Sequence, residues 1–374
     1  MTSRDVRHSL RELLRGRGEW LAFAVLLIAL GFLPLMNGPG YEWNLVVGLM
    51  APVWAGVSAA RRVERDAVVT SGFAALLDGT KRGIVHAGLV VLVPCVRGLI
   101  SGFCEPALEI SFVVLGAGVG TILGSGSGAL VGFLLPRRSV STDARRASSW
   151  RSMGRAVLAG VTGPLLAALV GLVEFHRSPA VYLFSDFVGF FAGPLYEVVD
   201  FPISRLLTYR IAAVFRWLAL LAASATLVRT TAGRLALQRI SAARALWGVV
   251  AGAAALAFFF AGPSLGHRTT AQSLREGLGG NVSDGPCEVV YQRGALPREH
   301  AALVARECAG HWRAFAEEWS FSPPEHVTVF LFADERSKKH FVGVGQTYVA
   351  KPWRREVYVQ NAGNAKPLVV TGTV

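Results

Sequence analysis

Three side chains that could bind a metal ion lie within one expected helical turn near the end of the chain. Cys308 and His311, at positions i and i+3, could reach one ion, and Glu307 lies beside them. A zinc site needs three or four ligands. His300 is on the same helix face but about three turns away, too far to share the ion, and Cys308 belongs to an apolar stripe. We therefore expect no metal site here and no bound cofactor.

The four cysteines fall into two pairs. Cys95 and Cys104 lie on one expected membrane span, nine residues apart, and point to opposite sides of it, so they cannot bridge. Cys287 and Cys308 lie in a later, water-soluble part of the chain. An oxidising compartment would permit a disulfide between them, and two buried free thiols are the alternative.

Recognisable catalytic motifs are missing from the sequence. There is no HExxH, no P-loop, no C-x-x-C and no serine-triad signature, and no histidine is followed by glutamate. We assign no catalytic residue.

Charged residues inside apolar segments are costly and mark functional or structural pairs. Arg97 lies in the outer half of the third apolar segment, and Glu105 and Glu109 open the fourth at the same membrane face. An ion pair between Arg97 and Glu109 would neutralise both. A proton or substrate relay would need a chain of such groups, which the other segments do not offer near their middle.

The fourth apolar segment carries a glycine at every fourth position: Gly116, Gly120, Gly124, Gly128 and Gly132. This spacing allows the backbone of a neighbouring helix to approach closely. We interpret the stripe as a helix-packing surface, with a ligand or ion path along the groove as the alternative.

These segments belong to a pattern that organises most of the chain. Hydrophobic residues make up 52% and charged residues 17%, and about 25% charged is typical of soluble domains. Seven apolar stretches are long enough to approach or span a bilayer, at about Trp20–Met36, Leu45–Ala60, Ile84–Phe103, Leu108–Leu135, Ala156–Phe175, Ile211–Val228 and Ala245–Pro263. The expected fold is thus a polytopic α-helical membrane bundle over residues 20–263.

Arginine and lysine collect in alternate loops, which places those loops in the cytoplasm. Basic residues fill the leader 1–19 and the loops after the second, fourth and sixth spans, whereas the loops 37–44 and 104–107 have none. The N-terminus is therefore expected in the cytoplasm, as an uncleaved signal anchor, and residues 264–374 outside it. The net charge of +13 is explained by these loops, which contact anionic lipid. No basic face is interleaved with stacking aromatics, so we expect no nucleic-acid partner.

The long outer loop 176–205 is rich in aromatic residues and broken by glycine and proline. We expect it to be a re-entrant or interfacial segment. Asp186, Glu197 and Asp200 could line a shared cleft there, and ordinary surface acids are the alternative.

The outer part of the chain has the periodicities of a small α/β domain. We expect strands at Cys287–Tyr291, Val327–Phe332 and Glu356–Gln360, and helices at Pro297–Trp319 and Glu335–Phe341. The apolar stripe of the longer helix is Val304, Cys308, Trp312, Phe315 and Trp319.

Several short segments of this domain resemble the front part of membrane-anchored gluzincin-type zinc metallopeptidases, the peptidase MA-like group. They are Leu278–Gly280, the strand His326–Asp334 with its following helix, Lys351–Val359 and, in the long loop, Gly193–Glu197. In that family a helix bearing HExxH follows the last strand, its histidines bind zinc and its glutamate activates water. None of these residues has a counterpart in this chain. The resemblance implies a relative truncated before the HExxH helix, or one that has lost catalysis, with zinc expected only if that helix were present.

These observations predict a multi-pass protein of the cell membrane that presents an incomplete peptidase-like domain outside the cytoplasm. It would anchor or bind a protein or envelope ligand without catalysis. Two alternatives remain at this stage: a fragment of an active membrane zinc metallopeptidase, and a transporter or channel built on the glycine stripe.

Overall fold

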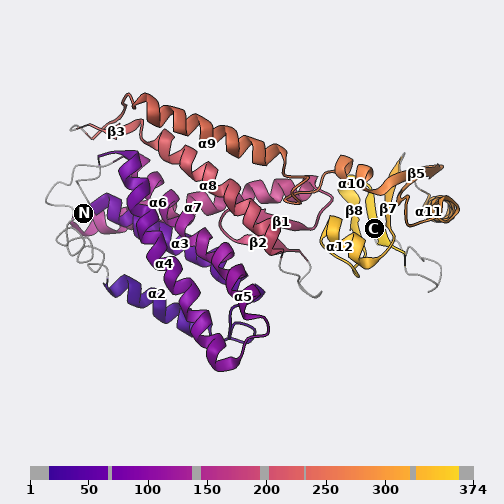
Figure 1. Ribbon diagram of the computed structural model, residues 1–374, viewed down its shortest axis with the longest axis horizontal. Helices are drawn as coiled ribbons and strands as arrows, with labels where there is room; N and C mark the ends of the chain where they lie inside the picture. Colours follow the sequence, from indigo (N-terminus) through magenta and orange to yellow (C-terminus); the bar gives the residue numbers. More distant parts are fainter. Residues whose placement is uncertain are drawn as a thin grey trace. The chain divides into compact units, whose positions relative to one another are not determined.

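The computed structural model describes residues 17–65, 70–136, 145–193, 202–230, 233–320 and 326–361. The chain divides into two compact units (Figure 1). The helical unit takes in the described parts of 1–171, 184–191 and 200–261. The α/β unit takes in the described parts of 172–183, 192–199 and 262–374.

The helical unit is built from long apolar helices. They are α2 (Arg17–Leu30), α3 (Tyr41–Arg65), α4 (Gly72–Ser101), α5 (Pro106–Val113), a π-helical turn (Val114–Gly118), α6 (Val119–Leu134), α7 (Arg145–Arg177), α8 (Ile203–Ser224) and α9 (Ala242–Phe260). Within the described residues, six helices are long and apolar enough to cross a membrane, and α5 and α6 form one of them together. These six overlap the second to seventh predicted spans, although α4 begins 12 residues before the predicted Ile84 and α8 begins eight residues before the predicted Ile211.

The first predicted span differs from the observed helix. Helix α2 has 14 residues and ends at Leu30, so it is about 21 Å long and shorter than a hydrocarbon core of about 30 Å. Gly31 disfavours further helix, and Leu33 precedes Pro34, which pushes its backbone out of the helical region. The prediction of a span through Met36 therefore extended the helix too far.

The glycine stripe packs closely against α3 and the 182–192 hairpin. A Cβ at Gly124 would lie 2.5 Å from the Pro52 carbonyl oxygen of α3, and a Cβ at Gly128 would overlap the Gly56 backbone. A Cβ at Gly120 would overlap the Phe187 carbonyl group. Backbone from α3 and from the 182–192 hairpin therefore fills the groove that these glycines create.

Two short hairpins accompany the helices. One joins β1 (Tyr182–Ser185) to β2 (Gly189–Ala192), and the other joins β3 (Leu227–Arg229) to β4 (Leu235–Leu237). The first hairpin belongs to the loop that the sequence predicts to be re-entrant or interfacial.

The α/β unit contains a five-stranded sheet in the order β5-β6-β7-β9-β8. Its elements are α10 (Ala271–Leu278), β5 (Gly279–Asp284), β6 (Cys287–Gln292), α11 (Arg298–Trp319), β7 (Val327–Phe332), α12 (Glu335–Val342), β8 (Val349–Lys351) and β9 (Glu356–Gln360). Strands β6, β7 and β9 are parallel, and the edge strands β5 and β8 are antiparallel to their neighbours. The three predicted strands and two predicted helices are therefore present, and β5, β8 and α10 are additions.

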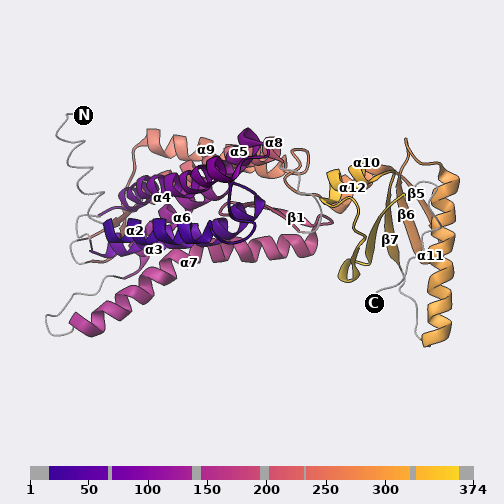
Figure 2. The same ribbon diagram turned by 90° about the horizontal axis from the view of Figure 1, so that it is seen from below.

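Helices cover both faces of this sheet, as Figure 2 shows for α11 on one side. Val304 and Ala305 of α11 pack on Val289 and Leu331. The other face buries Leu274 of α10 and Val342 of α12. Its cluster also includes Val290, Phe330, Tyr358 and, from the segment after α7, Val181.

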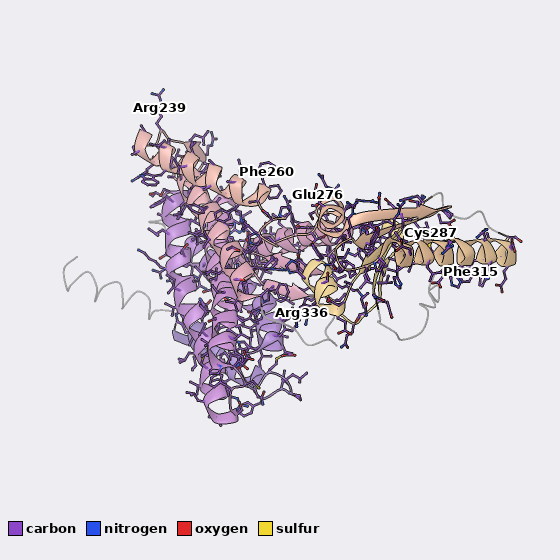
Figure 3. The ribbon with its side chains drawn as sticks, turned by 45° about the vertical axis from the view of Figure 1, so that its right-hand side comes forward. Arg239, Phe260, Glu276, Cys287, Phe315 and Arg336 are labelled. Atoms are coloured by element: carbon purple, nitrogen blue, oxygen red, sulfur yellow. A yellow bond between two sulfur atoms is a disulfide. The ribbon has the colours of Figure 1, made fainter. Side chains whose placement is uncertain are left out.

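The apolar stripe of α11 is only partly used by the sheet. Ala301, Val304, Ala305 and Ala309 are buried, whereas Trp319 at the end of the helix is 72% exposed. Figure 3 shows Phe315 on the half of α11 that lies beyond the sheet. The predicted stripe is therefore correct in its first half, half-buried at Trp312 and Phe315, and exposed at Trp319.

Candidate functional site

A row of polar side chains crosses three strands of the sheet on the face that α10 covers. Glu288 of β6 pairs in register with Thr328 of β7, and Thr328 pairs with Glu356 of β9. Neighbouring residues in register point to the same face of a sheet. Thr328 and Glu356 are 4% and 8% exposed, so the row lies within the domain.

Glu288 anchors the first end of the row. Arg275 of α10 donates to both of its carboxylate oxygens at 2.6 Å. Thr328 donates to Glu288 Oε2 at 3.4 Å, and His326 Nε2 lies 3.2 Å from the same oxygen. The hydrogen bonds from Arg275 lower the pKa of Glu288 and raise the pKa of Arg275. Glu288 is therefore an ionised structural partner of α10.

Glu356 forms an equivalent pair at the other end. Arg354 donates from Nε at 2.6 Å and from Nη2 at 2.9 Å to the two carboxylate oxygens. The hydroxyl of Tyr358 donates to Glu356 Oε2. Burial, and then the hydrogen bond with Glu356, raise the pKa of Tyr358. This second carboxylate is therefore held by a guanidinium and a phenol.

His326, Thr328 and Glu288 include the residue types of a nucleophile and a base, but their geometry is that of a structural network. His326 Nε2 lies 3.0 Å from Thr328 Oγ1 and, with the same nitrogen, faces Glu288. In a catalytic triad the carboxylate orients the other ring nitrogen. Thr328 is also almost fully buried, which denies its hydroxyl to a substrate. The row joins β6, β7 and β9 and fixes α10 on the sheet.

Lys351 lies at the end of β8, in register with Glu356. Its ammonium group is buried, at 1% exposure, and donates to the carbonyl oxygens of Ser178 at 2.7 Å, Ala180 at 2.8 Å and Phe175 at 3.2 Å. Burial, followed by the charge of Arg354, lowers the pKa of Lys351 to about 8. Lys351 therefore caps the last carbonyl groups of α7 and the segment after it.

Further contacts fix the same segment within the α/β unit. Trp353 Nε1 donates to the His176 carbonyl at 3.0 Å, and its ring stacks on His176 at 5.3 Å. Ser178 Oγ donates to the Thr269 carbonyl at 2.8 Å, and Val181 N donates to the Val342 carbonyl at 2.8 Å. The end of a membrane-type helix is thus an integral part of this domain.

A second polar cluster lies inside the helical unit, where the tip of the β1–β2 hairpin meets α3, α8 and the π-helical turn. Arg210 is 3% exposed and donates to the carbonyl oxygens of Leu115, Gly116 and Asp186, the last at 2.6 Å. Asn44 accepts from Ala117 N at 2.7 Å and donates to the Val188 carbonyl at 3.1 Å. The extra residue of a π-turn leaves such backbone groups available for side chains.

The acidic residues expected to line a cleft have different fates. Asp186 forms an ion pair with Arg216 of α8. Glu197 and Asp200 lie outside the described residues. A shared cleft of the three is therefore not observed within the described part of the loop.

The two expected pairs of side chains also have different outcomes. Cys287 and Cys308 form a disulfide between β6 and α11, with Cα atoms 6.1 Å apart. Arg97 does not pair with Glu109: its Nη2 donates to the Gly31 carbonyl at 2.7 Å and its guanidinium lies over the Phe32 ring. Because α2 ends at Leu30, the Gly31 carbonyl has no helical partner and competes successfully for the arginine.

The residues considered as metal ligands remain dispersed on α11. Cys308 is taken by the disulfide. In the described part of the chain, no group of three or more His, Cys, Asp or Glu side chains is arranged to hold a metal ion. Glu307, His311 and His300 do not gather into a site.

Comparisons with protein-family models, with curated proteins and with solved structures found no match to this chain. The polar row was not identified from the sequence, although each of its members is a polar residue in the first two positions of a strand whose central residues are apolar. That pattern was the available signal, and only the strand register shows that the three residues adjoin.

Proposed function

We propose that this chain is a multi-pass membrane protein that holds its α/β domain outside the cytoplasm, where the domain binds a protein or envelope ligand without catalysis. The observation that carries the proposal is the composition of the α/β unit. Besides the described part of 192–199, this unit combines residues 172–183, which contain the end of α7, with the described residues from 262 onward, which follow α9.

This composition requires α7 and α9 to end on the same side of the membrane. One helix, α8, lies between them in sequence, so a single return crossing satisfies the requirement. The basic loops after α3, α6 and α8 mark the opposite side as cytoplasmic. These loops support an outer position of the domain whether or not the short α2 crosses the bilayer.

The contacts of Lys351 and Trp353 with the end of α7 support a domain that includes the end of this helix as well as the chain after α9. Trp353 is 51% exposed beside the end of a membrane-type helix, and tryptophan is enriched at membrane interfaces.

Binding is favoured over hydrolysis by the state of the buried carboxylates. Both oxygens of Glu288 and of Glu356 accept from guanidinium groups, and a general base needs a lone pair directed at its substrate or water. The exposed Trp319 and the distal half of α11 offer an aromatic surface of the kind that protein interfaces use. The likeness to the front of a gluzincin-type domain remains part of this proposal.

The sidedness can be tested with a membrane-impermeant maleimide on intact cells. The background variant replaces Cys95 and Cys104 with serine, and single cysteines are then introduced at Glu317 in α11 and at Arg239, which points away from the helices in Figure 3. We expect labelling at position 317 and none at 239 until the cells are opened. The reverse pattern would overturn the proposed orientation.

Absence of catalysis is tested on the purified full chain in detergent with added zinc. We expect no hydrolysis of casein above a heat-denatured control, and less than stoichiometric zinc by plasma mass spectrometry. Stoichiometric zinc together with hydrolysis would overturn the proposal of a binding domain.

A further inference from the structure

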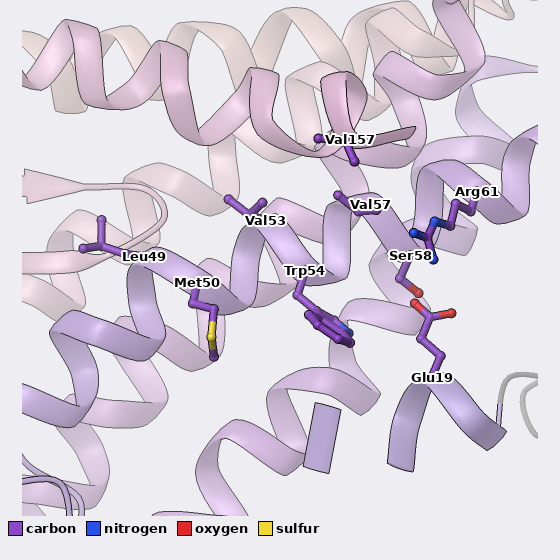
Figure 4. Close-up of a pocket in the computed structure, with 9 residues that line it drawn as sticks. All are labelled: Glu19, Leu49, Met50, Val53, Trp54, Val57, Ser58, Arg61 and Val157. Carbon is purple, nitrogen blue, oxygen red and sulfur yellow. The ribbon is translucent and has the colours of Figure 1, made fainter. Parts of the chain in front are cut away.

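A groove of about 440 Å³ runs along α3 between α2 and α7 (Figure 4). This volume lies within the range of about 300–1,000 Å³ for small-ligand sites. Its floor is one stripe of α3, at helical spacing: Leu49, Met50, Val53, Trp54, Val57, Ser58 and Arg61. Glu19 of α2 and Val157 of α7 complete the lining.

The groove has an apolar end and a polar end. From Leu49 to Arg61 the stripe rises by about 18 Å, which is close to half of a hydrocarbon core of about 30 Å. Leu49 and Val157 are 58% and 42% exposed, so the groove opens sideways, towards lipid if α3 and α7 cross a membrane. Its length and apolarity suit one acyl chain of one leaflet.

Two buried polar atoms in the groove lack partners. Ser58 is 3% exposed, and neither its Oγ nor the indole nitrogen of Trp54 has a hydrogen-bond partner among the described residues. An unsatisfied buried polar group costs about 1–3 kcal/mol. A ligand that places hydrogen-bonding atoms at this end of the groove would recover that cost.

The polar end also presents one charge of each sign. Figure 4 shows the Glu19 carboxylate directed towards Ser58 and Arg61. Within the described residues no ion pair joins Glu19 to Arg61, and the guanidinium of Arg61 donates to the sulfur of Met153. A carboxylate and a guanidinium side by side complement a ligand that carries both an amine and a phosphate.

We propose that this groove binds one phospholipid whose headgroup is zwitterionic and carries a primary amine, as in phosphatidylethanolamine. The Arg61 guanidinium would bind the phosphate, for which its planar fork is suited. Glu19 would accept from the ammonium group, and Ser58 and Trp54 would donate to the phosphate or ester oxygens. One acyl chain would lie on Leu49, Val53 and Val157.

The test measures phospholipid bound to the purified full chain by native mass spectrometry. The delipidated protein is exposed to mixed micelles containing phosphatidylethanolamine, phosphatidylcholine or phosphatidylglycerol. Phosphatidylcholine keeps both charges but has no ammonium N–H, and phosphatidylglycerol has no cation. We expect one bound lipid per chain and about tenfold preference for phosphatidylethanolamine, the effect of one charge-assisted hydrogen bond.

Variants assign the contacts to residues. Glu19→Gln should abolish the preference among headgroups, and Arg61→Gln should weaken all three lipids. Val157→Trp should fill the groove and prevent binding. Val170→Trp is its matched control on the same helix, because Val170 is 66% exposed and does not line the groove. If Val157→Trp fails to fold, Leu49→Trp blocks the apolar end instead.

Three results would overturn the proposal. One is equal lipid retention by Val157→Trp and Val170→Trp. Another is a preference for phosphatidylglycerol that persists in Glu19→Gln, which would show an anionic lipid held by arginine alone. The third is a dimer in detergent that carries no bound lipid and that Val157→Trp alone dissociates, which would make a second copy of the chain the occupant.

Discussion

The ammonium group of Lys351 lies 2.7 Å from the carbonyl oxygen of Ser178, although 173 residues separate them in the sequence. The same ammonium binds the carbonyls of Ala180 and Phe175. The side chain of Lys351 therefore joins strand β8 to the end of α7 and the segment after it. Its substitution should weaken the domain as a whole and not one edge of the sheet.

Lys351→Met is expected to lower the stability of the α/β domain by about 1–3 kcal/mol, since it leaves several buried carbonyl groups without a donor. The measurement is the apparent Tm of the full chain in detergent. Arg336→Met, at an exposed position of α12, is the control and should change the Tm little. Equal Tm values for the two variants would contradict the proposed role of Lys351.

Lys351 also predicts how stability changes with pH. Its pKa is lowered from 10.5 to about 8 in the folded protein, so the unfolded chain binds more protons between these values. Stability therefore rises with pH in this window, by at most about 1.4 kcal/mol per pH unit for one proton. The Tm advantage of the wild-type chain over Lys351→Met should grow from pH 7 to pH 9.5.

Two neighbouring groups, Arg354 and Tyr358, determine the pH range in which this measurement reports on Lys351. The hydrogen bond with Glu356 raises the pKa of Arg354, so its guanidinium keeps its charge throughout the window. The raised pKa of Tyr358 acts in the opposite sense above about pH 10, because the unfolded phenol ionises there first. A Tm difference that is flat or falls between pH 8 and 9.5 would contradict the lowered pKa of Lys351.

Arg210 should be irreplaceable by lysine. Its planar guanidinium donates to the carbonyls of Leu115, Gly116 and Asp186 from three different nitrogen atoms. The single nitrogen of a lysine ammonium cannot reproduce this geometry. We expect Arg210→Lys to destabilise the helical unit by about 2–4 kcal/mol, measured as the temperature at which the detergent-solubilised chain aggregates. Arg239→Lys, on an exposed segment, should leave this temperature unchanged.

The sequence predicts those elements whose burial pattern is strong. Strands β7 and β9 have the predicted bounds, and α11 differs by one residue, because long apolar periods identify them. Strand β5, which reads Gly-Gly-Asn-Val-Ser-Asp, carries one large apolar residue. Such an edge strand forms because β6 offers it backbone partners, so no pattern in its own residues could reveal it.

The polar contacts depend on information that the sequence does not hold. The charges of Arg97 and Glu109 and their expected depth in the membrane predict an ion pair. In the structure, the arginine binds the carbonyl of Gly31, which the end of α2 leaves available. Glu288, Thr328 and Glu356 are separate strand residues until the register aligns them. Hydrophobic periodicity in the sequence identifies a helix or a strand. The polar partners of its side chains depend on which elements lie beside it in the sheet or bundle.

The glycine stripe predicts a large difference between two glycine-to-alanine substitutions. A methyl group at Gly128 would overlap the Gly56 backbone, whereas nothing lies within 4 Å of a Cβ at Gly252 in α9. Gly128→Ala should therefore cost about 1–3 kcal/mol, and Gly252→Ala should be neutral or stabilise by about 0.5–1 kcal/mol. Thermal aggregation of the two variants measures both effects, and similar values would contradict the close packing of α3 and α6.

The disulfide between Cys287 and Cys308 yields a prediction about thiol number. After unfolding without reductant, the full chain should bind two equivalents of maleimide, at Cys95 and Cys104, and four after reduction. The bond closes a loop between residues 21 apart, so its loss should cost about 2–4 kcal/mol.

Paired variants separate this bond from the cysteines themselves. Cys287→Ser should lower the Tm and expose one new thiol, at Cys308, whereas Cys104→Ser should leave the Tm unchanged and remove one thiol. The bond also depends on the compartment, because a disulfide persists where the environment is oxidising. Four reactive thiols in protein taken from cell membranes under acid quenching would contradict both the bond and the placement of the domain outside the cytoplasm.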